Sequence, residues 1–286
     1  MEGTKRTVFW LVLPMLLEVV ALFVIPLLVL FRYSFYPFVP GQGLVTGFVL
    51  KNYSKFLFDS YYLEILVRTL WLGFLVAFFA LLLGYPLALF LAKSNSRFKT
   101  VLLILVVLPL LSSAVIRTYG WMILLGTNGL VNKLLLQLGL VSAPVKFMYT
   151  LRGVVVALTE VLLPFMVLTL VPVIRNIDRS LEEAALGLGA SKLRTFLTVV
   201  FPLSLPGVAA GSIFVFVLAI SSFVTPSLMG GPSVRVMSSL VREQAISLLN
   251  WPFAAAVSLV LLVVVTTLVA LYQRALISAG KWEVPK

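Results

Sequence analysis

Six long apolar stretches constrain this chain more than any other feature of its sequence. They occupy residues 8–31, 62–92, 100–125, 152–174, 204–228 and 253–273. Each is long enough to cross the roughly 30 Å hydrocarbon layer of a bilayer as a helix, which takes about 20 residues. Together they hold 150 residues but only six of the 32 charged side chains. The sequence therefore predicts an all-α membrane protein with six transmembrane helices.

The same stretches favour helices over the strands of a membrane barrel. Residues 101–111 and 259–265 are apolar on every face, whereas barrel strands alternate apolar and polar residues. Lys5 and Arg6 precede the first stretch, as they would in a signal peptide, but its apolar run of about 24 residues is too long and lacks a small-residue cleavage site. We expect it to remain as the first span, and we interpret residues 1–286 as a single transmembrane domain.

The basic residues predict how the chain is oriented. Twelve Lys or Arg fall within the 56 residues of segments 1–7, 93–99, 175–203 and 274–286, whereas the other three loops carry seven in 80 residues. Because cytoplasmic loops are the ones enriched in Lys and Arg, both termini and residues 175–203 are predicted to be cytoplasmic. This topology signal accounts for most of the net charge of +12, so nucleic acid is not expected as a partner.

The composition excludes several kinds of chemistry. The chain has neither cysteine nor histidine, which rules out disulfides, thiolate or imidazole metal sites and Ser-His-Asp nucleophiles. A phosphate-binding loop needs glycine directly before Lys-Ser or Lys-Thr, and the one Gly-Lys pair, Gly280-Lys281, is followed by Trp282. We therefore expect no metal, no cofactor and no catalytic residue in this chain.

Residues 175–203 have more helix signals than an inert connector needs. Ser180 and Glu183 have the spacing of a capping box, in which Ser180 caps a helix and Glu183 bonds back to it. The apolar side of this helix consists of Leu181, Ala184, Ala185 and Leu188. The pattern predicts a short amphipathic helix on the cytoplasmic face.

A glycine break follows this helix. Gly187 and Gly189 permit a sharp exit, and Ser191 is placed to cap a second helix that runs towards Pro202. Residues 175–203 are therefore predicted to form a helix-turn-helix.

This segment resembles a known family. Glu183-Ala184-Ala185, three residues, Gly189, nine residues and Val199-Val200-Phe201-Pro202 are similar in spacing to the EAA loop of permease subunits in bacterial ATP-binding-cassette importers, which reads E-A-A, three, G, nine, I-x-L-P. Val199 and Phe201 replace the usual Ile and Leu. In that family the loop forms a coupling helix that docks on an ATPase subunit. The resemblance implies docking by Glu183, Ala184, Ala185, Gly187, Gly189 and Pro202; capping alone would also fit a plain connector.

Short motifs extend the resemblance along the chain. In order they are Asn52-Tyr53, Leu83-Gly84-Tyr85-Pro86, Ile116-Arg117-Thr118-Tyr119-Gly120, Leu163-Pro164-Phe165-Met166, Gly187-Leu188-Gly189-Ala190-Ser191-Lys192, Met229-Gly230-Gly231 and Trp251-Pro252-Phe253. They are similar to the first membrane subunit of spermidine/putrescine importers, and permeases for iron, opines and other small solutes share much of the pattern. The resemblance implies an importer-type permease fold in the bacterial cytoplasmic (inner) membrane.

The resemblance also implies a function and a set of partners. The chain would form half of the pathway for a small solute, first of all a polyamine, with opines, amino-acid derivatives or ferric ion as alternatives. Its partners would be a second, homologous permease, a dimer of ATPase subunits that carries ATP and Mg²⁺, an extracytoplasmic solute-binding protein and membrane lipid. A stand-alone secondary transporter is the alternative class.

Four side chains inside the predicted spans are candidates for the pathway of the solute: Glu160, Arg117, Tyr119 and Trp121. A mid-span charge costs at least ~2.5 kcal/mol unless it is used or paired. Glu160, close to the helix-breaking Pro164, is a candidate to meet a cationic solute, or else it pairs with Arg117 or is protonated. Tyr119 and Trp121 are either anchors at the membrane interface or cation-π contacts for a polyamine.

Overall fold

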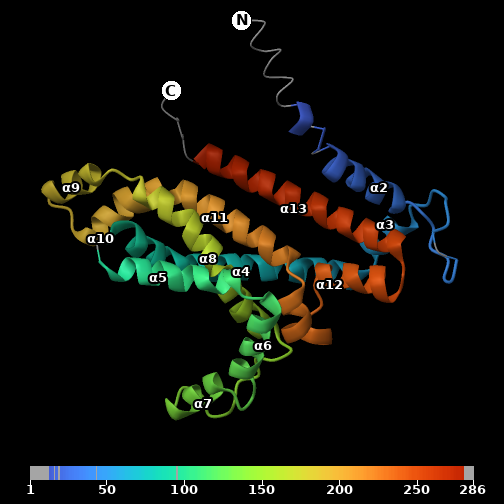
Figure 1. The fold of residues 1–286 in the computed structure, drawn as a ribbon, viewed down its shortest axis with the longest axis horizontal. Coiled ribbons are helices and arrows are strands. Elements are labelled where there is room, and N and C mark those ends of the chain that lie inside the picture. The colour runs from blue at the N-terminus through green and yellow to red at the C-terminus, as the bar shows by residue number, and fades with distance from the viewer. Residues whose placement is uncertain (1–12, 16, 19, 43, 95, 280–286) are drawn as a thin grey trace, which may run out of the picture. The chain divides into compact units, whose positions relative to one another are not determined.

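The computed structural model describes residues 13–279 apart from residues 16, 19, 43 and 95 (Figure 1). The described residues form helices, turns and loops, with one isolated bridge between Phe38 and Leu44 and no strand. The predicted all-α class is therefore confirmed. In chain order the helical elements are η1 (Val20–Val24), α2 (Ile25–Tyr33), α3 (Lys51–Phe58), α4 (Ser60–Lys93), α5 (Phe98–Val107), η2 (Leu108–Leu111), α6 (Ala114–Leu125), α7 (Leu130–Gln137), α8 (Leu151–Arg175), α9 (Arg179–Gly187), α10 (Lys192–Thr195), η3 (Phe196–Val200), α11 (Phe201–Ser221), η4 (Pro226–Gly230), η5 (Gly231–Ser233), α12 (Met237–Arg242), η6 (Glu243–Ser247) and α13 (Trp251–Ala279).

Five helical segments among the described residues are long and apolar enough to cross a membrane. They are Leu13–Tyr33, Ser60–Lys93, Leu151–Arg175, Lys192–Ser221 and Trp251–Leu276. The predicted stretches 62–92, 152–174 and 253–273 match three of them closely. Residues 8–12 of the first predicted stretch lie outside the described residues. A sixth span results if the bent pair Phe98–Leu111 and Ala114–Gln137 is counted as one.

That bent pair corrects the third predicted span, 100–125. The chain passes from α5 into the 3₁₀ helix η2, breaks at Ser112 and Ser113, and turns by 106° into α6. Pro109 at the start of η2 has no backbone N–H, and the Ser113 hydroxyl caps α6 by accepting from the N–H of Val115 at 3.3 Å. The prediction of one continuous helix was wrong because hydropathy does not register such local breaks.

The fifth predicted span, 204–228, also needs correction. The helix ends at Ser221, and Pro226 begins a separate π-helical turn, η4. The hydroxyls of Ser221 and Ser222 donate to the carbonyls of Val217 and Leu218 at 2.8 and 2.9 Å. Such side-chain bonds slightly weaken and bend a helix. The following residues are still mostly apolar, so hydropathy does not register where the helix ends.

The chain divides into two compact units, which are described separately. Unit 1 comprises Met1–Glu64 and Leu240–Thr266, and unit 2 comprises Ile65–Ser239 and Thr267–Lys286. In unit 1 the Asn52 amide donates to the carbonyls of Ser34 and Tyr36 at 2.8 and 3.0 Å. The Lys55 ammonium lies 4.6 Å from the centre of the buried Phe253 ring. Asn52 and Phe253, which belong to the quoted motifs, therefore have packing roles here.

The core of unit 2 is built on the packing of α8 against α11. Gly207 and Gly211 on α11 face α8, and a Cβ added to them would lie 2.9 Å from Cβ of Val173 and 2.8 Å from Sδ of Met166, respectively. Small residues four apart let two membrane helices approach closely. This contact fixes the position of α8, the helix that carries Glu160.

Candidate functional site

The segment after α8, residues 175–203, begins with a different cap from the one that the sequence predicted. Asp178, not Ser180, is the N-cap of α9, and its carboxylate accepts from the N–H of Ser180 at 2.9 Å. This backbone N–H and the Ser180 hydroxyl hold the pKa of the Asp178 carboxyl below its ordinary value. The predicted capping box is wrong because a carboxylate two residues earlier also complements the positive end of the helix.

Gly189 ends α9 in a Schellman motif. Its backbone has a φ of 86°, its N–H donates to the carbonyl of Leu186 at 2.9 Å, and the N–H of Ala190 donates to the carbonyl of Ala185 at 3.1 Å. These two bonds satisfy carbonyls that the end of a helix otherwise leaves without partners, and the left-handed φ suits glycine. The predicted glycine break is confirmed.

Most apolar residues of α9 are exposed in the part of the chain that the structure describes. None of the residues in α9 is buried, and Leu188, just after it, is 91% exposed. The exposed set includes Leu181, Glu183, Ala184, Leu186, Gly187 and Gly189, whereas Ala185 is half-buried. An exposed leucine-rich helix outside the spans is a surface suited to binding another protein.

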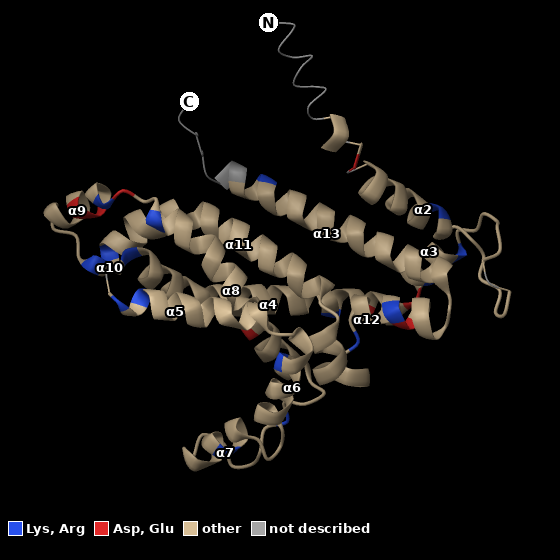
Figure 2. Ribbon diagram, viewed as in Figure 1, with Lys and Arg blue, Asp and Glu red and all other residues tan. Residues whose placement is uncertain are grey.

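The second predicted helix is only partly separate. Ser191 caps α10 by accepting from the N–H of Arg194 at 3.3 Å, as predicted. The helix then runs through the π-helical turn η3 into α11, and Pro202 is the second residue of α11, just after η3. Lys and Arg lie on α10 and at the start of α5, whereas α9 carries one Arg and two Glu (Figure 2).

The structure joins two of the four predicted pathway residues. The indole Nε1 of Trp121, on α6, donates to Oε2 of Glu160, on α8, at 3.1 Å. The buried hydroxyl of Thr118 lies 3.1 Å from that of Thr225, which ties α6 to the segment before η4. Both members of the Trp121–Glu160 pair are half-buried, so the carboxylate is held in place while still partly accessible.

Arg117 and Tyr119 are not part of this pair. Nε and Nη1 of Arg117 are buried without a hydrogen-bond partner among the described residues, and the alternative ion pair with Glu160 is not formed in the structure. Tyr119 is 52% exposed on α6. Sequence reasoning selected all four residues but found no signal for the contact between α6 and α8, since its members are 39 residues apart.

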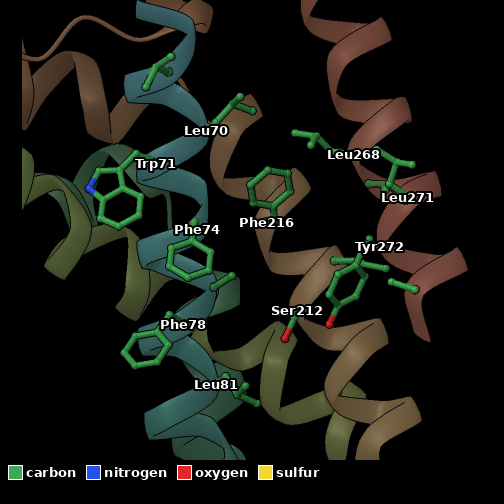
Figure 3. A pocket seen from close by; sticks show the side chains of 15 residues that line it. Leu70, Trp71, Phe74, Phe78, Leu81, Ser212, Phe216, Leu268, Leu271 and Tyr272 are labelled. Carbon is green, nitrogen blue, oxygen red and sulfur yellow. The ribbon is translucent and has the colours of Figure 1, made fainter. Parts of the chain in front are cut away.

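An apolar groove in unit 2 lies apart from the Trp121–Glu160 pair. It has a volume of about 840 Å³ and is lined by α4, α11 and the part of α13 after residue 266 (Figure 3). Trp71, Phe74 and Phe78 stack along α4 on one wall. Ser212 and Tyr272 contribute hydroxyls, but the lining has no charged side chain and none of the four pathway candidates. The groove is therefore an apolar and aromatic surface, separate from the Trp121–Glu160 pair.

Residues 80–279 match one protein family, described as binding-protein-dependent transport system inner membrane component. Among curated proteins, the chain is 39% identical over 228 residues to the spermidine/putrescine transport system permease protein PotB of Escherichia coli (strain K12), covering 80% of this chain and 82% of that protein. It is 35% identical over 226 residues to PotB of Haemophilus influenzae, with 79% of each covered.

Two further matches come from a more distant relative and from solved structures. The chain is 31% identical over 261 residues to the inner membrane ABC transporter permease protein YdcU of Escherichia coli, covering 87% of this chain and 83% of that protein. A bacterial ABC transporter involved in the import of the acidic polysaccharide alginate matches 96% of both chains with a TM-score of 0.75 at 18% identity. The second likeness shows a shared fold.

Proposed function

Because the chain belongs to the family of binding-protein-dependent transport system inner membrane components, we propose that it is one of two permease subunits of an ATP-driven polyamine importer. It is a multi-pass inner-membrane permease. The observation that carries the proposal is α9: it has the importer-type Glu-Ala-Ala and glycine spacing, and it buries none of its residues within the chain. The similarity to PotB over four fifths of the chain supports a spermidine- or putrescine-like solute.

The proposed topology has six spans and cytoplasmic termini. It counts α5 to α7 as one broken span and is supported by the distribution of Lys and Arg. The chain has no cysteine, so single introduced cysteines report topology without background. A membrane-impermeant maleimide added to spheroplasts should label a cysteine at Ser142 and leave one at Lys192 unlabelled. The opposite labelling would overturn the orientation.

ATP hydrolysis is proposed to take place on a separate pair of ATPase subunits, which bind ATP and Mg²⁺. This chain has no phosphate-binding loop of the Gly-Lys-Ser/Thr type, and α9 with Leu188 offers a surface for docking. Glu183, Ala184, Ala185, Gly187 and Gly189 are the proposed docking residues, with Pro202 placing the following helix. Co-purification of an ATPase with the wild-type chain tests the proposal, and an active importer without one would refute it.

The remaining partners complete the importer. A second, homologous permease would close the pathway, because one bundle alone would leave a polar path open to lipid. An extracytoplasmic solute-binding protein would deliver the solute. The mass of the intact complex tests this composition: one copy of this chain with one copy of a different permease is expected, and two copies of this chain would refute a heteromeric pair.

The solute is proposed to be a small organic cation that meets Glu160. The Trp121 indole holds this carboxylate in a membrane helix at 3.1 Å, and an aromatic ring beside a carboxylate suits an alkylammonium group. Arg117 and Tyr119, on the same helix as Trp121, are proposed to lie along the same pathway. Uptake by the reconstituted importer with its binding protein should be competed by spermidine or putrescine. Competition by ferric ion or opines alone would refute the polyamine assignment and leave the importer assignment standing.

A further inference from the structure

Two interactions join the end of α4 to the start of α9. The ammonium of Lys93, the last residue of α4, forms an ion pair with Oε1 of Glu182 on α9. In return, the guanidinium of Arg179, the first residue of α9, donates from Nη2 to the backbone carbonyl of Lys93 at 3.3 Å. The partners are 89 and 86 residues apart in sequence. Two distant helix ends are therefore linked in both directions.

The charges also suit the two helix ends that carry them. Lys93 lies at the negative end of α4, and Glu182 lies in the first turn of α9, where negative charge is favoured. Arg179 satisfies one of the carbonyls that the end of α4 would otherwise leave without a partner. The Lys93 and Glu182 side chains are only 28% and 22% exposed, so their pairing is partly shielded from water.

The covalent connections of α9 lead to other helices. Its N-terminal end follows α8 after residues 176–178, and its C-terminal end leads through α10 and η3 into α11. Neither connection reaches α4, a 34-residue helix and one of the candidate spans. The contacts of Lys93 are therefore what ties α9 to a third long helix.

We infer that Lys93, Glu182 and Arg179 form a clasp that makes α4 move with α9 when α9 is displaced by the ATPase. The inference rests on the proposed function, since it takes α9 as the docking element. Lys93 is a positioning residue: it acts through Glu182 and Arg179 and touches neither the solute nor ATP. Because a surface ion pair contributes little to folding stability, its loss should affect coupling more than assembly.

The test uses the complete importer in proteoliposomes, with the solute-binding protein present. In Lys93→Glu the ATPase should remain bound and basal ATP hydrolysis should stay near the wild-type value. The stimulation of hydrolysis by the loaded binding protein should fall at least fivefold, and uptake should fall with it. The matched control is Lys99→Glu, which makes the same charge change on α5 at a similarly half-buried position and should behave as wild type.

Rescue separates the clasp from a structural effect. Lys93→Glu combined with Glu182→Lys should restore most of the stimulation and uptake. Residue 182 lies on the docking helix, so its substitution could affect docking directly, and a second measurement is needed. Cysteines are introduced at 93 and 182 in the otherwise cysteine-free chain and joined with a short bifunctional thiol reagent. The joined protein should still transport if the two helix ends move together.

Each outcome has a defined meaning. The clasp would be overturned if the loaded binding protein stimulated ATP hydrolysis normally in Lys93→Glu, or if that variant lost the ATPase. It would also be overturned if neither the charge exchange nor the cross-link supported transport. A wild-type complex without a bound ATPase would instead refute the proposed function.

Discussion

Gly189 provides the sharpest test of how α9 is built. At a φ of 86° an alanine is strained, and no atom lies within 4 Å of the Cβ it would add, so the backbone strain is the whole cost. The left-handed conformation costs a non-glycine residue about 1–2 kcal/mol. The variant is expected to relieve this strain by opening the cap in the free chain, and docking must then close the cap again. Because about 1.4 kcal/mol is a factor of ten in an equilibrium constant, Gly189→Ala should weaken the affinity for the ATPase by up to roughly five- to thirtyfold.

Gly187→Ala is the comparison for helix stability. Gly187 is the last residue of α9 and also has open space around its Cβ position, and in a helix interior alanine is favoured over glycine by about 0.8–1.0 kcal/mol. Gly187→Ala should therefore strengthen the helix, so the two substitutions have opposite signs.

The assay has two readouts. Titration of the ATPase against the permease complex in lipid nanodiscs gives the change in Kd. Hydrogen exchange of the Gly189 and Ala190 amides, which donate the two Schellman bonds, reports whether the cap has opened. Equal affinities for the wild type and Gly189→Ala, with unchanged amide protection, would refute the reasoning.

The other predictions concern the pathway, the core and the start of α9. Glu160→Gln should lower polyamine uptake and solute-stimulated ATP hydrolysis in an intact complex; unchanged values would return Glu160 to a structural role. Gly207→Val should destabilise the protein by about 1–3 kcal/mol through overpacking against α8, seen as a lower Tm in detergent, whereas Gly120→Ala, with open space around it, should not. The pKa of Asp178 is lowered on folding. Its stabilisation of α9 should therefore be present above the ordinary aspartate pKa of about 3.9 and be lost as the pH falls through the lower folded pKa. Asp178→Asn should abolish that acid dependence while keeping the cap, and amide exchange of α9 measured against pH would show both effects.

Most of the long helices could be predicted, because mean hydropathy depends on the length and composition of an apolar stretch. The spans at 62–92, 152–174 and 253–273 are uninterrupted apolar runs, and the structure has helices there. The break at Ser112 and Ser113 depends on a proline and a serine cap, which occupy few residues and barely change the mean hydropathy of the stretch. The positions of uninterrupted apolar helices are therefore easier to read from the sequence than their ends and breaks, on which the number of spans depends.

The candidate site could be predicted only where its residues are neighbours in sequence. The glycine break and the Ser191 cap are local patterns and were found. The cap at Asp178 was missed because two acceptable caps stand two residues apart, and only backbone geometry decides between them. The Trp121–Glu160 bond and the clasp at Lys93 join residues far apart in the chain, so they depend on tertiary packing that periodicity does not encode.

The exposure of Leu188 has a consequence for how the subunit survives in a cell. A leucine that is 91% exposed beside a helix with no buried residue is the kind of surface that chaperones and proteases recognise in unassembled proteins. Under the proposed function, a copy made without the ATPase would present that surface to the cytosol. The steady-state level of this chain is then expected to follow the supply of the proposed partner, so that unassembled permeases do not accumulate in the membrane.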